Sequence, residues 1–135
     1  NLDGANLRHA RMQAADLSDA DLSTADLTRA SCAGALFPQA TLRRTNLTGA
    51  NLHSADFSGA DLTEADLEQA DLRNSVFRDA TVDRADFDEA MLDSADLSSL
   101  DTSTESLDTL SEGRDISSES PLCAALSPAR ERITP

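Results

Sequence analysis

The sequence predicts an all-β fold, in which short extended segments joined by turns coil around one apolar interior. Every fifth residue from Leu2 to Leu97 is apolar, in twenty consecutive copies. The residue two places earlier is alanine in seventeen of nineteen copies, with Thr45 and Ser75 as the exceptions. A step of five fits neither the helical period of about 3.6 nor the two-residue alternation of a long strand. A spacing of two places both apolar side chains on one side of a short extended segment, and the polar residues between suit turns.

The phenylalanines indicate how many segments form one coil. Phe37, Phe57 and Phe77 all occupy the apolar slot and follow one another at intervals of 20 residues. A coil of four segments would stack the three rings in one column, although this spacing alone does not establish the number four. We expect core columns that contain Leu17, Phe37, Phe57, Phe77 and Leu97 in one case, and Leu52 and Leu72 in another.

Individual copies of the repeat carry a resemblance to a known family. They include Ala15-Asp16-Leu17, Ala50-Asn51-Leu52, Ala60-Asp61-Leu62 and Ala65-Asp66-Leu67. These copies fit the consensus A(D/N)LXX, and over about residues 1–99 the sequence resembles the pentapeptide-repeat family. The resemblance implies a right-handed quadrilateral parallel β-helix with four pentapeptides per coil. About five coils would then form a rod roughly 24 Å long. The Asp or Asn of each copy is interpreted as structural, hydrogen-bonding to the backbone of a corner.

The chain beyond the repeats is expected to differ from them. The register fades after Leu97, and Thr102 and Glu105 have the spacing of a capping box. Residues 103–112 are therefore predicted to form a short helix that lays Leu107 and Leu110 over the open end of the rod. We divide the chain into a β-helix over 1–100, a C-terminal cap over 101–113 and a tail over 114–135 that is either extended or ordered by a partner. Because the chain begins at Asn1, its N-terminus is expected to be processed or incomplete.

The composition excludes several classes of function. The 25 acidic residues and 11 arginines give a formal net charge of −14, which has the wrong sign for binding nucleic acid directly. No apolar run is long enough to span a bilayer, and two cysteines are too few for a disulfide framework. Membrane-spanning and disulfide-stapled classes are therefore not predicted.

The residues that most often carry chemistry form no recognisable site. In the four-sided arrangement, His9 and His53 lie on different faces and two coils apart, and Cys32 occupies a core slot. The carboxylates are too regular to single out a catalytic pair, and no glycine-rich phosphate loop is present. We therefore predict no catalytic residue, no metal site and no cofactor, and hence no enzyme.

Two kinds of surface remain as candidates for contact with a partner. Leu36, Val76 and Met91 stand where the repeat usually has Asp or Asn, which indicates either an apolar contact strip or ordinary variation. Acidic residues are densest over 79–96, which indicates either a docking surface for a basic protein or a solvated face. The candidate partner surface comprises Leu36, Val76, Met91, Asp79, Asp83, Asp86, Asp88, Glu89, Asp93 and, in the tail, Leu122, Cys123 and Leu126.

Two functions follow from these observations and from the resemblance. The first is a non-enzymatic structural or interaction module, a rigid acidic rod that docks onto a larger protein assembly. Some members of the family occur in the thylakoid lumen, so that compartment is one expectation and the cytoplasm is the alternative. The second function is a DNA mimic, because some members are acidic rods that bind type II topoisomerases such as DNA gyrase. The sequence does not identify the partner, and it leaves a homodimer open.

Overall fold

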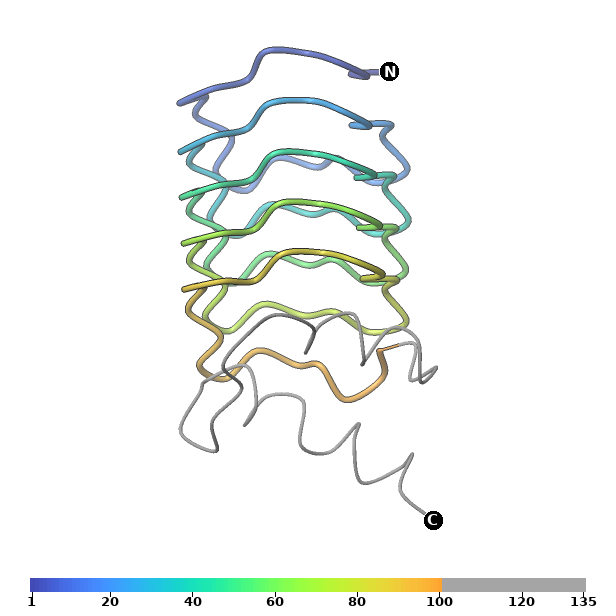
Figure 1. Cartoon of the computed structure of the whole chain (residues 1–135), viewed down its shortest axis with the longest axis vertical. Coiled ribbons are helices and arrows are strands. Elements are labelled where there is room, and N and C mark those ends of the chain that lie inside the picture. Colours follow the sequence, from blue (N-terminus) through green and yellow to red (C-terminus); the bar gives the residue numbers. More distant parts are fainter. Residues whose placement is uncertain (101–135) are drawn as a thin grey trace.

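In the computed structural model, which describes residues 1–100, the chain forms a four-sided parallel β-solenoid (Figure 1). Fifteen isolated parallel bridges connect neighbouring coils, and each joins residues twenty apart, from Asn6 and Asp26 to Val76 and Asp96. A repeat of five therefore closes one coil every four copies, which confirms the interpretation of the phenylalanine spacing. Residues 1–100 contain no helix, and each extended segment contributes a single bridging residue rather than a longer strand. The five coils are 1–20, 21–40, 41–60, 61–80 and 81–100.

A β-turn forms every corner of the rod. The N–H of the residue in the alanine slot donates to the carbonyl of the apolar residue three places earlier, as from Ala25 to Leu22 at 3.0 Å. The residue just before the alanine slot has a positive φ at nineteen successive corners, from Gly4 to Ser94. Fifteen of these residues are not glycine, and their φ lies between 55° and 62°. A positive φ at the third turn residue alone is the pattern of a type II turn.

Three backbone hydrogen bonds per segment connect one coil to the next. On one segment, the N–H groups of Leu7 and His9 donate to Asp26 and Thr28 at 2.7 and 3.0 Å. In return, the N–H of Asp26 donates to the carbonyl of Ala5 at 2.9 Å. Because the same three bonds recur down the rod, backbone polar groups between coils are satisfied without long strands.

The apolar slots fill the interior, as the sequence predicts. Phe37, Phe57, Phe77, Leu52 and Leu72 are fully buried, and Leu97 is nearly so. The rings of Phe37 and Phe57 stack with centroids 4.9 Å apart, and Phe57 and Phe77 repeat that distance. This distance lies close to the usual spacing of neighbouring strands, so the ladder and the rings share one period. The exceptional Thr45 and Ser75 are also buried, and their hydroxyls donate to the carbonyls of Leu22 and Leu72, respectively.

The first and last coils depart from this regularity. Leu17, expected in the core, is only half-buried, as are Leu2, Leu7 and Met12, because within residues 1–100 the first coil packs against another coil on one side only. At the other end, the Asp79 N–H donates to Ser99 instead of Ser98, and the last turn bond lengthens to 3.4 Å. The regular hydrogen-bonding pattern therefore weakens at Ser99 and Leu100, where the described part of the chain ends.

Several predictions concern residues outside the described part of the chain. They are the cap over 101–113 with its helix, the tail over 114–135, and the candidate contacts Leu122, Cys123 and Leu126. Within residues 1–100 there is no helix with the length and hydropathy that crossing a bilayer requires.

Candidate interaction surfaces

The corners hold the polar side chains in place through a repeated local motif. Thirteen of the twenty slots before the apolar residue hold Asp or Asn, and each Oδ1 accepts from the N–H two residues later at 2.8 to 3.2 Å. Six of the aspartates also accept from the hydroxyl of that later Ser or Thr, at 2.5 to 2.7 Å. The interpretation of this slot as a structural Asx motif is confirmed.

These contacts also set the electrostatics of the corners. The Ser18 hydroxyl and N–H, both donating to Asp16, hold the pKa of that carboxyl below its ordinary value. Ser23 lowers the pKa of Asp21 in the same way. Partial burial raises the pKa of Asp61, but hydrogen bonds from Thr63 and Arg43 outweigh it, so the net direction is downward. Such carboxylates stay charged in neutral solution and stabilise the turns that carry them.

Outward side chains are described most simply by the four faces of the rod. Each face consists of five residues that recur every twenty, in accordance with the bridges. The first face comprises 1–4, 20–24, 40–44, 60–64 and 80–84; the second 5–9, 25–29, 45–49, 65–69 and 85–89; the third 10–14, 30–34, 50–54, 70–74 and 90–94; and the fourth 15–19, 35–39, 55–59, 75–79 and 95–99.

The acidic stretch over 79–96 does not form a single patch. It is almost one full coil, so Asp79 lies on the fourth face, Asp83 on the first and Asp93 on the third. The structure brings only three of the predicted carboxylates onto one face, the second. Two carboxylates from the preceding coil join them there because they stand twenty residues earlier. This acidic patch consists of Asp66, Glu68, Asp86, Asp88 and Glu89.

The acidic patch carries no arginine of its own. Both arginines of the second face, Arg8 and Arg29, belong to the first two coils, and Arg8 pairs there with Asp26 at 3.1 Å. Within the patch, the Gln69 amide donates to Glu89 at 3.0 Å. Glu68 therefore occupies the slot that Arg8 holds three coils earlier, and Gln69 the slot that Arg29 holds two coils earlier. The sequence signal that identifies Asp66 and Glu68 is the 20-residue period, not local acidity.

The apolar departures from the repeat are not brought together. Leu36 and Met91 are the large hydrophobic side chains most exposed in the described part, at 40% and 42%, while Val76 is half-buried. Leu36 and Val76 share the fourth face, but Asp56 bridges to both and stands between them. Met91 lies on the third face. An apolar strip of Leu36 and Val76 is therefore interrupted by a carboxylate.

Leu36 has a local explanation. The Asx motif needs an N–H two residues after the Asp or Asn, and the residue two places after Leu36 is Pro38. Proline has no N–H, so an acidic residue at this position would lack its donor. The same argument does not apply to Val76 or Met91, which precede Arg78 and Asp93 by two residues.

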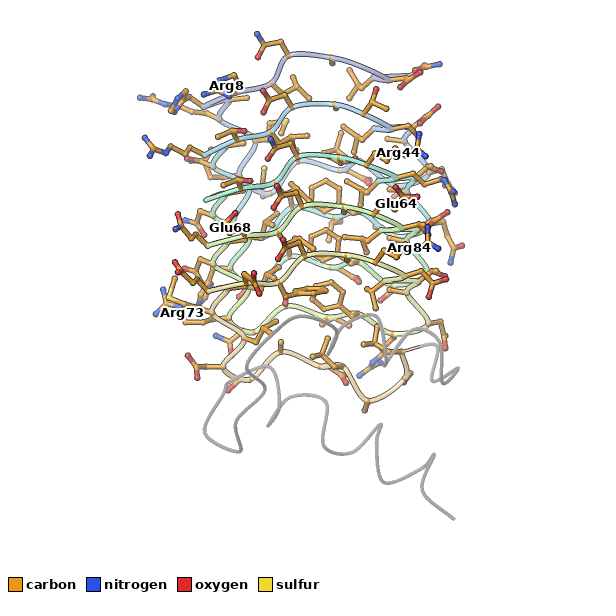
Figure 2. All side chains as sticks on the ribbon, viewed as in Figure 1. Arg8, Arg44, Glu64, Glu68, Arg73 and Arg84 are labelled. Atoms are coloured by element: carbon orange, nitrogen blue, oxygen red, sulfur yellow. The ribbon has the colours of Figure 1, made fainter. Side chains whose placement is uncertain are left out.

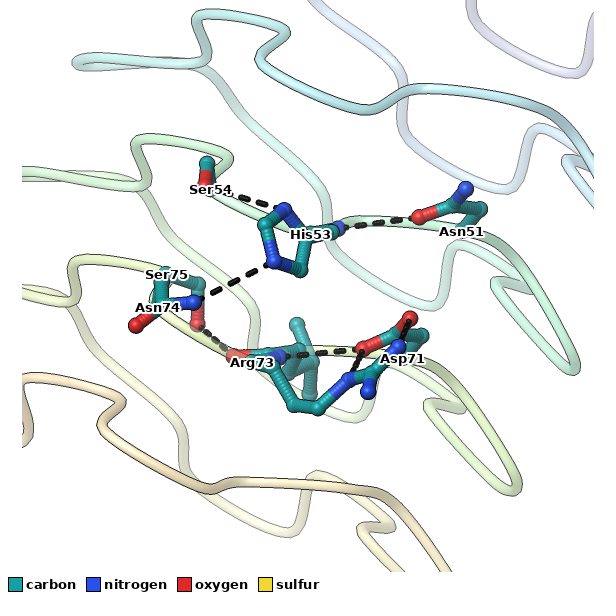
Figure 3. Close-up of polar contacts among 8 residues, drawn as sticks. Asn51, His53, Ser54, Asp71, Arg73, Asn74 and Ser75 are labelled. Carbon is teal, nitrogen blue, oxygen red and sulfur yellow. Dashed lines mark hydrogen bonds and ion pairs between the residues drawn. The ribbon is translucent and has the colours of Figure 1, made fainter.

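His53 lies in a polar group that spans two coils (Figure 3). Its Nε2 lies 3.2 Å from the Asn74 amide nitrogen, and its Nδ1 lies 3.0 Å from the Ser54 hydroxyl. When the amide donates to Nε2, the proton resides on Nδ1 and donates to Ser54, so the ring does not act as a base toward that hydroxyl. Beside it, Arg73 binds Asp71 through two nitrogens at 2.9 and 2.7 Å.

The remaining reactive residue types have structural surroundings. Cys32 is fully buried, and burial raises the pKa of its thiol to about 11. A thiol in such surroundings is protonated and unreactive at neutral pH. His9 lies on the second face of the first coil and His53 on the third face of the third coil. No group of three His, Cys, Asp or Glu side chains within residues 1–100 is arranged to hold a metal ion.

Comparisons with known proteins agree with this architecture. The family model described as "Pentapeptide repeats (8 copies)" matches residues 1–29, 25–63 and 60–98. A pentapeptide repeat protein of known structure from the cyanobacterium Cyanothece 51142 is 29% identical with a TM-score of 0.64; the match covers 68% of this chain and 60% of that one. A second, from Nostoc PCC 7120, is 37% identical with a TM-score of 0.58, covering 58% and 65%. The chain thus spans less than two thirds of the length of either structure. No protein of curated function matches it in sequence.

Proposed function

The chain belongs to the pentapeptide repeat family of right-handed β-helices, and on this premise we propose that it is a non-enzymatic protein-interaction module. In this proposal the rod is a rigid scaffold that presents the acidic patch of its second face to a basic surface of a partner protein. The partner is a subunit of a larger assembly. The proposal concerns docking by a single copy of the chain.

The observation that carries the proposal is the gathering of five carboxylates on two consecutive coils of one face. The ladder fixes the backbone at Asp66 and Glu68 between two neighbouring coils. It also binds the backbone at Asp86 and Asp88 to the fourth coil, so binding would cost little ordering of the main chain. A preformed patch of one sign steers a partner of the opposite sign and raises the rate of association. The other candidate contacts lie on other faces and would touch a partner only if the partner wraps around the rod. They are Leu36, Val76, Met91, Asp79, Asp83 and Asp93.

The test removes the charge of the patch while preserving its corners. Asp66→Asn keeps the Asx acceptor, because Asn46 and Asn51 accept the same bond elsewhere in the rod. Combined with Glu68→Gln and Glu89→Gln, it removes three charges. The matched control is the triple variant Asp3→Asn, Asp16→Asn and Asp19→Asn, which removes three charges from equivalent slots elsewhere.

The partner is first isolated with the full wild-type chain from its native cells, identified by mass spectrometry and then purified. We expect the patch variant to bind this partner at least about tenfold more weakly and with a slower association rate, and the control to bind normally. Equal binding by all three proteins would refute docking through this patch. Fractionation of the same cells would assign the compartment, for which the thylakoid lumen and the cytoplasm are the two expectations.

A DNA-mimic role is the outcome that would replace this proposal. The described rod is short for that role, because five coils at strand spacing span about 24 Å, or roughly seven base pairs of a duplex. We expect the full chain to leave DNA gyrase supercoiling unchanged. Inhibition that disappears in the patch variant would instead assign the carboxylates to mimicry of DNA phosphates.

A further inference from the structure

One edge of the rod changes sign along its length. It is the corner between the second and third faces, and we refer to it as the charged edge. In the first two coils its charged side chains are arginines, whereas in the last two coils they are mainly carboxylates; Figure 2 shows Arg8 and Glu68 on the same side of the rod. From the first coil to the fifth, the charged edge consists of Arg8, His9 and Arg11; Thr28, Arg29 and Ser31; Thr48, Gly49 and Asn51; Glu68, Gln69 and Asp71; and Asp88, Glu89 and Met91.

At the positive end of the charged edge, two arginines have no carboxylate partner within residues 1–100. Arg11 and Arg29 are exposed, and neither forms an ion pair with a carboxylate of residues 1–100. The opposite corner of the second face shows no such segregation, because Arg44 pairs with Glu64 of the next coil at 3.3 Å and Arg84 follows them (Figure 2). Charges therefore alternate along that corner and separate along the charged edge.

The middle of the charged edge is small and uncharged. Thr48, Gly49 and Asn51 occupy it in the third coil, and Gly49 has no side chain to hold a neighbour away. The third coil lies two coil spacings from the first coil and two from the fifth, a distance of about 10 Å at the usual strand spacing. The arrangement is therefore self-complementary: rotation by 180° about an axis through the third coil places the arginines of one rod opposite the carboxylates of another.

We propose that the charged edge pairs two copies of this chain side by side and antiparallel, with a two-fold axis at the third coil. Such an interface is isologous, so every contact occurs twice. Arg29 of one copy faces Glu68 of the other, and Arg11 faces Glu89. Met91, one of the two most exposed large apolar side chains in the described part, packs beside the methylenes of the partner's Arg11.

The dimer is weak and specific. Its ion pairs are exposed and the contact is narrow, and the net charge of −14 on each copy opposes association. The local complementarity decides orientation more than affinity. Dimerisation uses Glu68 and Glu89, which also belong to the acidic patch proposed for docking. The inference nevertheless stands independently of docking, because the experiment contains only this chain.

The decisive experiment is a charge swap. One variant carries Arg11→Asp and Arg29→Glu, and the other carries Glu68→Arg and Glu89→Arg. Each change introduces a residue type that the repeat already uses at the same slot, as in Asp71, Glu64, Arg73 and Arg84. Folding is checked by circular dichroism, and self-association of the full chain is measured by sedimentation at increasing concentration.

We expect wild-type chains to dimerise reversibly, each variant alone to associate at least about tenfold more weakly, and an equimolar mixture of the two to form heterodimers. The controls reverse the same number of charges away from the edge: Arg43→Glu with Arg84→Glu, and Asp3→Arg with Asp19→Arg. They should dimerise like the wild type. A monomeric wild type, equal weakening by the controls, or a mixture that stays monomeric would each overturn the proposal.

Discussion

Inside the rod one contact repeats from coil to coil, whereas outside it successive coils differ. Phe57 stacks on Phe37 as Phe77 stacks on Phe57, at the same 4.9 Å between ring centroids. On the charged edge, by contrast, one slot holds Arg29, then Gly49, Gln69 and Glu89 on four successive coils. All four residues have positive φ, so the backbone beneath them is the same.

This difference shows that the inward residues determine the fold, whereas the outward residues distinguish one coil from another. The interior and the ladder fix the path of the backbone, and each coil contacts only its neighbours. The outward slots of the corners tolerate side chains of any charge and can therefore carry a charge pattern without changing the fold. Substitutions inside should therefore be costly in every middle coil, and substitutions outside should affect association but hardly stability.

The largest expected effect is the removal of one ring from the phenylalanine column. Phe57→Ala should lower the free energy of unfolding by about 3–5 kcal/mol, because a fully buried ring loses contacts with both neighbouring coils. Phe57→Leu, which restores the commonest residue of the slot, is the control and should cost less. Denaturant unfolding followed by circular dichroism measures both. A loss below 1 kcal/mol for Phe57→Ala, on the order of a surface change, would contradict the comparison.

A smaller contrast lies within the interior itself. Leu52→Ala in the third coil should cost about 2–5 kcal/mol, because that side chain is fully buried. Leu17→Ala should cost clearly less, since Leu17 is half-buried in the first coil. The same unfolding measurement applies to both variants. Equal losses would indicate that Leu17 is as well packed as the middle of the rod.

The corners should contribute a collective, pH-dependent stability. The pKa values of Asp16, Asp21, Asp26, Asp61, Asp71 and Asp96 are lowered in the folded chain. A lowered folded pKa gives stability that is present above the unfolded value, about 3.9, and is lost as the pH falls through the folded values. We therefore expect the melting temperature to be nearly constant between about pH 5 and 7 and to fall below about pH 4.

A double variant separates this titration from other effects of acid. Asp16→Asn with Asp21→Asn keeps the side-chain oxygens that accept from the N–H groups of Ser18 and Ser23 but has no carboxylate to protonate. Its melting temperature should fall less between neutral and acid pH than that of the wild type, as measured by thermal unfolding across the pH range. An identical decline in both proteins would assign the acid sensitivity to other groups.

Most of the fold could be predicted from the sequence because its signal is one-dimensional. The five-residue period identifies the buried slots, and the phenylalanines at intervals of 20 indicate four segments per coil, which the bridges between residues twenty apart confirm. The half-burial of Leu17 depends on its place at one end of the rod, which a periodic pattern treats like any other copy. The Asx motif could also be predicted, since its donor lies two residues away.

The interaction surfaces were harder to predict from the sequence, because residues that are consecutive in the chain lie on different faces of the rod. Acidity over 79–96 extends around four faces, whereas Glu68 and Glu89 share one face although they are 21 residues apart. The acidic patch and the charged edge become visible in the sequence only when outward residues that stand twenty apart are compared with one another. Leu36 required a different step, from composition to chemistry, because its departure from the repeat follows from the missing N–H of Pro38.

The missing N–H of Pro38 leads to the smallest expected effect on stability. Val76→Asn introduces an acceptor that the Arg78 N–H can use, so the new hydrogen bond, worth about 0.5–1.5 kcal/mol, should offset the lost contacts of a half-buried valine. Leu36→Asn gains no such bond, because Pro38 offers no donor, and should be less stable than Val76→Asn by about 1 kcal/mol. Combining Leu36→Asn with Pro38→Ser supplies the N–H, so a double-mutant cycle should show favourable coupling between the two positions. If the two substitutions change the free energy of unfolding additively, Pro38 is not the reason for the leucine at position 36. The residue in this slot would then depend less on its corner than the thirteen Asx motifs suggest.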